Sequence, residues 1–435
     1  MPAALHHVVI VGGGFGGLYA ARALRHAAVR VTLIDRHNHH LFQPLLYQVA
    51  TGGLSPANIA APLRGLLSRQ QNADVVMAEV TDINVGSRHV VLANADFPRI
   101  NYDTLIVATG SQYNYFGHPE WERIAPPLKS IDDATTIRRR VLGAFEKAEL
   151  ETDRSKQQAW MTFVIVGGGP TGVELAGALA EVAHHTLARD FRRIRPQDAQ
   201  IILCEGQVSV LGQFPPDLRQ KATASLARLG VTVRVQVLVT QIDEHGVTMK
   251  VGERQESIAA RTVLWTAGVV GSPLGTALAK AIGLSTDRAG RLMVEPDLSL
   301  PGHAEIFVIG DLANCSHQTG EPLPGVAPVA MQQGQYVTDV ILRRLEGQPP
   351  PGPFHYHDRG NMATIGRASA VADLGWLHLS GYLAWLTWLF VHLMYLVQFQ
   401  NRVLVFVQWA YCYFTRDRSA RLITHQPPDH PQPEK

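Results

Sequence analysis

The sequence has few charged residues, and this scarcity already disfavours some classes of function. Asp, Glu, Lys and Arg make up only 17% of the 435 residues, whereas globular chains contain about 25%. A surface that meets lipid or a partner subunit produces such a low fraction. The net charge of +2 gives no general attraction to nucleic acid, so a DNA- or RNA-binding function is disfavoured.

Cysteine is also scarce. Cys204, Cys315 and Cys412 lie far apart, and none belongs to a CxxC or CxxxxC pair. We expect buried, inert thiols in a reducing compartment. A first strand pattern begins at His6. Because this leaves no room for a signal peptide, we expect the catalytic part of the protein to lie in the cytosol.

Two segments of the sequence share one pattern. The first is HHVVIVGGGFGGLYAARAL, from His6, and the second is MTFVIVGGGPTGVELAGALA, from Met161. Each combines a short β-branched run, a glycine cluster and an alanine-rich helical pattern, which together open a βαβ unit. Each is followed by another strand pattern that ends in an acid, Asp35 or Glu205. The chain is therefore expected to contain two nucleotide-binding units.

The glycines of the first cluster have separate physical tasks. Gly12 permits a tight turn, Gly14 lets a pyrophosphate approach the backbone, and Gly17 lets the helix pack closely on the strand. The helix N-terminus offers free N–H groups and a positive dipole end to the phosphates. Asp35 is expected to accept hydrogen bonds from ribose hydroxyls. Strand, glycines, helix and acid together predict a dinucleotide site.

The second cluster, Gly167, Gly169 and Gly172, repeats this design. Glu205 at the end of the following strand favours an unphosphorylated ribose, and therefore NADH over NADPH. Because a flavin accepts two electrons at once and passes them on singly or together, the economical interpretation is FAD in the first unit and NADH in the second.

Glu174 lies shortly after Gly172, in what we take as the first turn of the helix. Two interpretations stay open. The acid is either stabilised by the helix dipole, or it acts where the nicotinamide meets the flavin.

An aromatic-rich apolar run extends from Leu379 to Val397. As a helix it would reach roughly 28 Å, about one hydrocarbon core. Three features weigh against a span: His392 in its middle, the polar residues that follow, and the short second run, Val403–Phe414. Trp and Tyr prefer the headgroup level. We expect an interfacial helical pair in one leaflet, with a homodimer core and a true span as the alternatives.

Basic residues near this tract suit anionic lipid. They are Arg402, Arg416, Arg418 and Arg421, with Asp417 among them. The proline-rich end of the chain, THQPPDHPQPEK, is expected to be disordered.

Further motifs carry a resemblance to known proteins. The double glycine pattern, TLIVATG (Thr104–Gly110), the TAG after Trp265 and the VIGD ending at Asp311 resemble the two-dinucleotide-binding-domain flavoprotein superfamily. Three stretches are more specific and resemble type II NADH:quinone oxidoreductase, the single-subunit respiratory NADH dehydrogenase that pumps no protons. They are FQPLLYQVATGGLSP (Phe42–Pro56), PGVAPVAMQQGQYV (Pro324–Val337) and NRVLVFVQWAYCYFTRDRSARLI (Asn401–Ile423).

The resemblance implies an α/β fold with two Rossmann-like domains and a C-terminal membrane-associating helical region. The expected parts are a discontinuous FAD-binding domain (1–120 and 288–370), an NADH-binding domain (121–287), the membrane-attachment region (371–423) and a disordered tail (424–435). NADH would pass a hydride to FAD, and two electrons would then reach a membrane quinone. The enzyme would lie at the cytoplasmic face of the cell membrane as a monotopic homodimer.

The resemblance also implies binding residues, and it implies no metal ligand. FAD would be held by Gly12, Gly14, Phe15, Gly16, Gly17, Asp35, Arg36, Val80, Ala108, Thr109, Gly110, Asp311, Ala327 and Pro328. NADH would be held by Gly167, Gly169, Thr171, Gly172, Glu205 and Gly268. A helix opening at Ala327 would direct its N–H groups toward the pyrimidine ring of the flavin, where they stabilise the charge of the reduced form.

The sequence departs from the family pattern at one position. The family commonly reads Ala-Gln-x-x-x-Gln, and its first glutamine has been linked to the quinone headgroup, but this chain has Pro328 there. Gln332 and Gln333 remain as candidate catalytic residues together with Glu174. Either glutamine contacts the quinone, or it is a surface or flavin-facing amide.

Rival functions are a sulfide:quinone oxidoreductase, a ferredoxin reductase and a membrane-tethered FAD/NADH sensor with little turnover. The first needs paired cysteines, which the sequence lacks, and the second leaves the aromatic tract unexplained. The sequence does not exclude the sensor.

Overall fold

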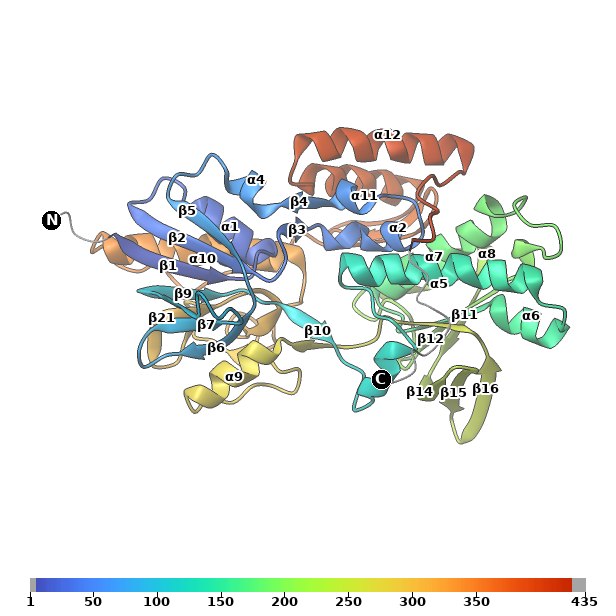
Figure 1. Cartoon of the computed structure of the whole chain (residues 1–435), viewed down its shortest axis with the longest axis horizontal. Helices are drawn as coiled ribbons and strands as arrows, with labels where there is room; N and C mark the ends of the chain where they lie inside the picture. Colours follow the sequence, from blue (N-terminus) through green and yellow to red (C-terminus); the bar gives the residue numbers. More distant parts are fainter. Residues whose placement is uncertain (1–4, 425–435) are drawn as a thin grey trace. The chain divides into compact units, whose positions relative to one another are not determined.

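A computed structural model describes residues 5–424 and consists of two compact units (Figure 1). Unit 1 contains the chain up to Leu41, Ala60–Gln112 and Val269–Arg359. Unit 2 contains Phe42–Ile59, Tyr113–Gly268 and the chain from Gly360 onward. Both units are therefore assembled from segments that are far apart in the sequence.

Unit 1 is built on a six-stranded sheet in the order β20-β21-β9-β1-β2-β5. Only β20 runs antiparallel to its neighbour. The central strands are β-branched runs buried on both faces, as a parallel sheet requires. The strands are β1 (His6–Val11), β2 (Val29–Asp35), β5 (Ala73–Met77), β9 (Thr104–Val107), β20 (Ser299–Leu300) and β21 (His303–Val308).

Two helices, α1 (Phe15–Ala23) and α10 (Ala327–Leu345), pack against each other in unit 1. The contact depends on glycine, because a Cβ on Gly334 would lie 2.5 Å from the carbonyl oxygen of Gly16. A second apolar core joins the sheet to an antiparallel meander and α9. These elements are β6 (Val80–Asn84), β7 (His89–Leu92), β8 (Arg99–Asn101) and α9 (Pro273–Ala281).

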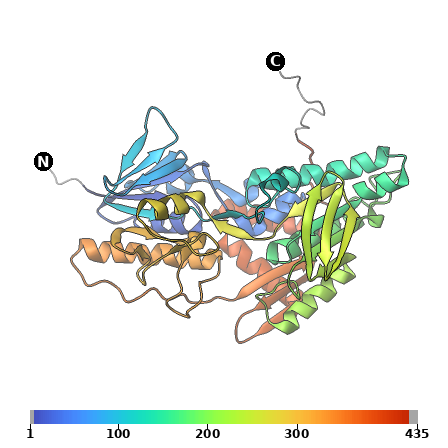
Figure 2. The ribbon, with the colours of Figure 1, turned by 90° about the horizontal axis from the view of Figure 1, so that it is seen from below.

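Unit 2 contains a four-stranded parallel sheet in the order β13-β12-β11-β17. An antiparallel sheet, drawn in yellow-green in Figure 2, shares an apolar core with it. The parallel strands are β11 (Thr162–Val166), β12 (Gln200–Glu205), β13 (Val231–Val235) and β17 (Thr262–Trp265). The antiparallel strands are β14 (Val237–Asp243), β15 (Gly246–Val251) and β16 (Arg254–Ala259). The main helices are α5 (Ile131–Leu150), α7 (Pro170–Glu181) and α8 (Pro216–Arg228).

The last part of the chain packs on α7 within unit 2. A Cβ on Gly177 of α7 would lie 1.9 Å from the carbonyl oxygen of Ile365, so only glycine allows this approach. The elements are β23 (Asn361–Gly366), β24 (Ser369–Asp373), β25 (His378–Gly381), α11 (Tyr382–Tyr395) and α12 (Phe399–Thr415). Two short helices from the early segment, α2 (Leu46–Ala50) and α3 (Pro56–Ile59), lie in the same unit.

Most sequence expectations agree with these elements. The α/β class with two parallel-sheet units is confirmed, and α10 begins at Ala327 as predicted. The helical pair occurs as α11 and α12, and no helix within residues 5–424 is both long and apolar enough to cross a bilayer. Residues 42–59, 113–120 and 360–370, assigned from sequence to the FAD-binding domain, lie in unit 2, and residues 269–287, assigned to the NADH-binding domain, lie in unit 1. Apart from Thr424, the expected disordered tail lies outside the described residues.

Candidate functional site

The first glycine cluster forms an open cradle between β1 and α1. Gly12 has a φ of +108°, and a Cβ on Gly17 would lie 1.8 Å from the carbonyl oxygen of Gly12. Both positions therefore require glycine for the turn and for the close packing. At Gly14 a Cβ would meet nothing within 4 Å. The free space lies at the N-cap of α1, where backbone N–H groups suit a diphosphate.

Asp35 stabilises this cradle from the end of β2. Its Oδ2 accepts a hydrogen bond from the Gly13 N–H at 2.6 Å, and its Oδ1 accepts one from the His37 N–H at 2.7 Å. Burial alone would raise the pKa of Asp35, but the hydrogen bonds from His37 and Gly13 outweigh it and lower the pKa. The carboxylate is thus ionised, and its remaining lone pairs can accept ribose hydroxyls.

Four further predicted flavin residues lie in unit 1, and Ala108 is in direct contact with the cradle. Ala108 lies against it, because a Cβ on Gly12 would be 2.3 Å from the Ala108 carbonyl oxygen. Asp311 accepts a hydrogen bond from the Ser111 hydroxyl at 2.8 Å, and Thr109 Oγ1 lies 2.6 Å from Ser272 Oγ. Pro328 occupies the first turn of α10, where a missing N–H costs nothing.

Four other predicted flavin residues, Phe15, Gly16, Arg36 and Val80, differ in their burial. Phe15 begins α1, and Gly16 is buried in it against α10. Arg36 is exposed, and Val80 is a partly buried residue at the start of β6.

His40 was not singled out from the sequence, yet it is buried beside the cradle. Its Nδ1 lies 3.0 Å from the Gly13 carbonyl oxygen. Because a carbonyl only accepts, Nδ1 carries the proton, and Nε2 is left as an acceptor with no partner among the described residues. Burial lowers the pKa of His40 to about 4, so the ring is neutral. A buried acceptor of this kind fits a ligand hydroxyl or amino group.

The second glycine cluster repeats the cradle in unit 2. Gly167 has a φ of +110°, and a Cβ on Gly172 would lie 1.9 Å from the Gly167 carbonyl oxygen. Gly169 again faces open space at the N-cap of α7. Glu205 Oε2 accepts the Gly168 N–H at 2.6 Å and its Oε1 accepts the Gln207 N–H at 2.7 Å. Glu205 therefore does for this cradle what Asp35 does for the first.

The TAG segment closes one wall of the second cradle. A Cβ on Gly167 would lie 2.6 Å from the Ala267 nitrogen, and Thr266 Oγ1 donates to the Gly167 carbonyl oxygen at 2.9 Å. Gly268 has a φ of +67°, and a Cβ there would lie 2.4 Å from the Phe116 ring. Thr171 lies in the first turn of α7, next to the open space at Gly169.

Glu174 lies deeper along α7 than expected. The helix begins at Pro170 and its first turn holds no acid, so the prediction that Glu174 belongs to the first turn is wrong. Its Oε1 accepts the Thr364 N–H at 3.4 Å. Burial raises the pKa of Glu174 to about 8 despite this hydrogen bond. A carboxyl group that is neutral near pH 7 can donate a proton, and a surface acid stabilised by the helix dipole would not show this shift.

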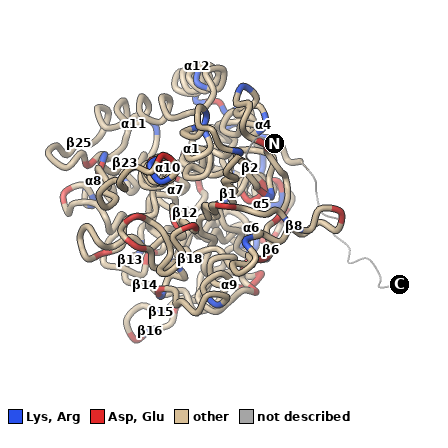
Figure 3. The backbone as a smooth tube through the Cα atoms, turned by 90° about the vertical axis from the view of Figure 1, so that its left-hand side faces the viewer, with Lys and Arg blue, Asp and Glu red and all other residues tan. Residues whose placement is uncertain are grey.

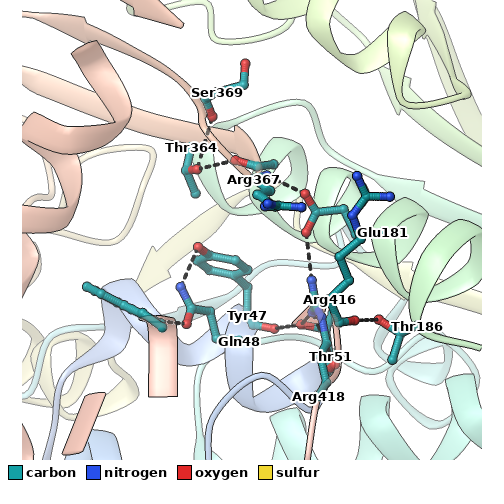
Figure 4. Close-up of polar contacts among 12 residues, drawn as sticks. Tyr47, Gln48, Thr51, Glu181, Thr186, Thr364, Arg367, Ser369, Arg416 and Arg418 are labelled. Carbon is teal, nitrogen blue, oxygen red and sulfur yellow. Dashed lines mark hydrogen bonds and ion pairs between the residues drawn. The ribbon is translucent and has the colours of Figure 1, made fainter. Parts of the chain in front are cut away.

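A buried tyrosine lies near this acid, and sequence reasoning missed it. Tyr47 of α2 is only 6% exposed. Gln48 Nε2 lies 2.8 Å from the Tyr47 hydroxyl oxygen (Figure 4), and Gln48 Oε1 lies 2.6 Å from Trp409 Nε1 of α12. The only sequence signal was their presence in FQPLLYQVATGGLSP, because the contact with α12 joins segments that are far apart in the chain.

An ion pair fastens the residues after α12 to α7. Arg418 Nη2 lies 2.9 Å from Glu181 Oε2, and Arg418 Nη1 donates to Thr51 Oγ1 at 2.7 Å (Figure 4). The Arg367 N–H donates to the other oxygen of Glu181. The two charged side chains are only 12% and 17% exposed, so the contact is largely shielded from water.

The two candidate glutamines are held by backbone groups of unit 1. Gln333 is buried and its Oε1 accepts the Gly310 N–H at 2.7 Å. Gln332 pairs with the backbone of His357 through both its Oε1 and its Nε2, each at 3.0 Å. Both amides thus stabilise turns of unit 1, and a quinone contact by either one stays a prediction.

The outer face of α11 and α12 is apolar. α11 holds no Lys, Arg, Asp or Glu and α12 holds only Arg402, so few coloured segments fall on this pair in Figure 3. Large exposed apolar residues of these helices include Tyr382, Leu383, Leu386, Phe390, Met394, Phe399, Val403, Leu404, Phe406, Val407, Tyr411 and Phe414.

The predicted basic cluster for lipid needs a correction. Arg418 pairs with Glu181, and Arg421 pairs with Asp190 and Asp417. These two arginines therefore neutralise acids of unit 2, and contact with anionic lipid stays a prediction that depends on Arg402 and Arg416.

The cysteines have no disulfide partner. Cys204 and Cys315 are buried, Cys412 is partly exposed, and all three are free. Burial raises the pKa of Cys204 and of Cys315 to about 11, so neither is a thiolate near neutral pH. Within residues 5–424, no group of three or more His, Cys, Asp or Glu side chains could hold a metal ion.

Family models match most of the chain. The model of the pyridine nucleotide-disulphide oxidoreductase family matches residues 6–334, and that of the NDH2 C-terminal domain matches residues 358–417. Among curated proteins, the type II NADH:quinone oxidoreductase NdhA of Mycobacterium tuberculosis is 46% identical over 429 residues. The match covers 97% of this chain and 90% of that protein.

Solved structures share the fold over nearly the whole chain. NDH2 of Plasmodium falciparum, in complex with NADH, has a TM-score of 0.88 at 20% identity, covering 97% of this chain and 100% of that chain. The sulfide:quinone oxidoreductase of Aquifex aeolicus has a TM-score of 0.67 at 17% identity, covering 96% and 92%. At such identities these likenesses describe the architecture alone.

Proposed function

The chain belongs to the type II NADH:quinone oxidoreductases of the pyridine nucleotide-disulphide oxidoreductase family, and we propose that its unit 1 holds FAD while its unit 2 holds NADH. Electron transfer from NADH to a quinone follows from the family. The observation that carries the assignment is the 46% identity to the M. tuberculosis enzyme over 97% of this chain. Two glycine cradles of one design, each braced by an acid, agree with two dinucleotides in one chain.

Unit 1 suits FAD by the form and charge of its cradle. The open backbone at Gly14 would receive the diphosphate, and Asp35 would accept the adenosine ribose hydroxyls. His40 Nε2 offers a further buried acceptor to the cofactor. FAD, when bound, accepts a hydride from NADH and delivers two electrons to a quinone.

Unit 2 suits NADH rather than NADPH. Glu205 lies at the end of β12. Its two carboxylate oxygens accept hydrogen bonds from the backbone N–H groups of Gly168 and Gln207. A fixed carboxylate there accepts the 2′-hydroxyl of the ribose and repels a 2′-phosphate. Gly169 supplies open backbone at the N-cap of α7, and Thr171 in the first turn of that helix is the next proposed contact.

Glu174 is the group we assign to proton transfer or substrate orientation in unit 2. Because burial raises its pKa to about 8, the Glu174 carboxyl group is protonated in most molecules at neutral pH. Reduction of a quinone consumes protons. A neutral carboxyl can donate one without the cost of separating a buried charge.

The apolar face of α11 and α12 is assigned to the membrane surface on the cytoplasmic side. Exposed Phe399 and Phe414 with neighbouring Trp and Tyr rings suit the headgroup level of one leaflet. A homodimer contact on the same helices is the alternative, distinguished by the molecular mass of the protein in detergent. Turnover without proton pumping, implied by the resemblance, is tested by a pH dye inside vesicles that carry the enzyme.

The decisive experiment measures NADH oxidation by purified protein and by membranes with a short-chain quinone. We expect fast NADH-dependent quinone reduction, poor activity with NADPH and none with sulfide. A yellow protein that NADH bleaches but quinone does not reoxidise would contradict the function and leave the two nucleotide sites intact. Activity with sulfide would instead favour the rival oxidoreductase.

A further inference from the structure

We propose that Tyr47 donates a hydrogen bond to a carbonyl oxygen of the quinone, and that Gln48 and Trp409 orient the Tyr47 hydroxyl for this contact. The inference rests on the proposed function and assigns a headgroup contact in a chain that has Pro328 in place of the family glutamine. Tyr47, Gln48 and Trp409 all belong to unit 2, so their contacts lie inside one unit.

The direction of the hydrogen bonds follows from the chemistry of the three side chains. An indole N–H only donates. Trp409 Nε1 therefore requires the carbonyl oxygen of the Gln48 amide at its 2.6 Å contact. This leaves the amide nitrogen of Gln48 facing Tyr47 at 2.8 Å. Because an amide nitrogen only donates, the Tyr47 oxygen must accept, and a flipped Gln48 amide would lose the hydrogen bond to Trp409.

The Tyr47 proton is consequently left without an acceptor. Tyr47 is 6% exposed, and no hydrogen-bond acceptor for its O–H is present among residues 5–424. Burial, and then the charge of Glu174, raise the pKa of Tyr47 well above its usual value, so the group stays a donor at any working pH. A buried donor without a partner is costly unless a ligand or water completes it.

A quinone is the ligand that fits this donor. Its carbonyl oxygens accept hydrogen bonds and donate none, and they gain negative charge as electrons arrive. A donor fixed in advance stabilises that charge more than the neutral ground state. Tyr47 keeps its own proton in this role, and the balance stays NADH, one proton and quinone giving NAD⁺ and quinol.

The origin of the anchoring residues favours the quinone over the nicotinamide. Trp409 belongs to α12, whose outer residues form the apolar face described above. Asn401 of the same helix donates to the Ala57 carbonyl oxygen at 3.3 Å, so α12 is joined twice to the segment that carries Tyr47. A lipid-soluble substrate arriving along α11 and α12 therefore meets the element that orients the hydroxyl.

The charged groups around Tyr47 do not change this assignment. Glu174 and Glu181 of α7 raise its pKa, whereas Arg418, after α12, lowers it. Glu181 and Arg418 neutralise each other in their ion pair. Among these charged groups, Glu174 is the one that is partly protonated near neutral pH. Its carboxyl group, which accepts the Thr364 N–H, could give the quinone a second hydrogen-bond donor.

The first test is Tyr47→Phe, which removes the hydroxyl and keeps the ring. Stopped-flow absorbance separates bleaching of the flavin by NADH from its reoxidation by a short-chain quinone. We expect an unchanged first phase and a second phase slowed about tenfold, the usual effect of one donor to a developing charge. The affinity of the oxidised enzyme for the quinone, measured by quenching of tryptophan fluorescence, should fall about threefold or more.

The second test is Gln48→Glu, which reverses one hydrogen bond without removing it. The carboxylate still accepts from Trp409, but its other oxygen now accepts the Tyr47 proton and turns it away from the substrate. We expect reoxidation by quinone to slow as much as in Tyr47→Phe, with the melting temperature nearly unchanged. A purely structural role for the pair would be preserved by this change, so normal quinone kinetics in Gln48→Glu would overturn the proposal.

The matched control is Tyr115→Phe. Tyr115 is also a buried tyrosine of unit 2, but its hydroxyl donates to the Ala125 carbonyl oxygen at 2.8 Å. We expect a small loss of stability and unchanged quinone kinetics. Slowing of the NADH phase in Tyr47→Phe, with the quinone phase intact, would assign the hydroxyl to the nicotinamide and refute the inference.

Different results would contradict the proposed function and the role of Tyr47. If the wild-type enzyme does not reduce quinone at all, the proposed function is wrong. If the wild type reduces quinone and both Tyr47→Phe and Gln48→Glu do so at the wild-type rate, only the role of Tyr47 is wrong. Flavin content and melting temperature measured for each variant separate misfolding from either outcome.

Discussion

Two acids, Asp35 and Glu205, do the same work at separate cradles. Each lies at the end of a parallel strand. Asp35 accepts a hydrogen bond from the Gly13 N–H and Glu205 accepts one from the Gly168 N–H, both at 2.6 Å. A carboxylate does this without giving up its capacity to bind ribose, because each oxygen has two lone pairs. The residue type can therefore hold the loop and bind the proposed ligand at once.

Matched amide variants of these acids should have separate effects. An amide nitrogen would face a backbone N–H in each cradle, so one charge-assisted bond of about 1.5–3 kcal/mol is lost. We expect Asp35→Asn to lose FAD on gel filtration and Glu205→Gln to keep it. Glu205→Gln should lower kcat/KM for NADH by roughly tenfold to a hundredfold. It should also lower the ratio of kcat/KM for NADH to that for NADPH. Equal flavin loss in both variants would contradict the assignment of one nucleotide to each unit.

A second prediction at the residue scale concerns Glu174. Its pKa of about 8 in the fold lies above the usual 4.5 of a glutamate side chain in water. Between these values the folded chain keeps a proton that the unfolded chain has released, so the free energy of unfolding falls as pH rises through this window. Glu174→Gln should retain FAD, turn over slowly, and become more stable than wild type by on the order of 4 kcal/mol near pH 8.

Thermal melts of both proteins from pH 5 to pH 9 check the stability part, and steady-state NADH oxidation checks the turnover part. The variant and the wild type should converge near pH 5, where Glu174 is protonated in the fold. A constant difference across the pH range would mean that the carboxyl does not titrate as described.

At the scale of elements, the residues after α12 depend on one shielded ion pair. Arg418 bridges Glu181 of α7 and Thr51 beside α2. Since removal of one partner leaves the other charge partly buried, we expect Arg418→Met to destabilise this region by about 2–3 kcal/mol. Hydrogen exchange should rise after α12 and in α2, and protease should cut there sooner.

The control for this prediction is Arg343→Met. Arg343 pairs with Asp339 one turn away on α10, and both side chains are largely exposed, at 40% and 50%. Such pairs contribute about 0–1 kcal/mol, so neither exchange nor proteolysis should change measurably. A double variant Arg418→Met with Glu181→Gln should lose less than the sum of the single losses, because the two residues act as one contact.

For the whole molecule, we expect the proposed membrane attachment to rest on apolar side chains rather than on charge. We expect the triple change Phe390→Ser, Phe399→Ser and Phe414→Ser to reduce sedimentation with liposomes by at least about tenfold, because each exposed ring contributes 1.5–3 kcal/mol when buried. NADH oxidation with ferricyanide, a water-soluble acceptor, should persist. Addition of salt should have little effect, since Arg418 and Arg421 are paired within unit 2.

Phe97→Ser serves as the control for attachment. Phe97 is 71% exposed but belongs to unit 1 and lies outside the helical pair. Liposome binding should be unchanged in this variant. Binding that is lost in high salt yet survives the triple change would show that attachment is electrostatic and would refute the assignment to α11 and α12.

The sequence by itself determined the parts of this protein that depend on local geometry. Glycine at Gly12, Gly17, Gly167 and Gly172 is required by positive φ or by a backbone contact within one βαβ unit, and such units are readable from spacing. The acids Asp35 and Glu205 follow from the same rule. The beginning of α10 at Ala327 was instead implied by the family resemblance, and Pro328 suits the first turn there.

Only the tertiary structure decided the rest, because those features join distant segments. The burial that raises the pKa of Glu174, the contact of Tyr47 and Gln48 with Trp409, and the ion pair of Arg418 with Glu181 all depend on how residues 42–59 and the C-terminal helices pack on α7. Burial and hydrogen-bond direction are properties of a packed environment. The same packing turned two expected lipid-binding arginines into internal partners of acids.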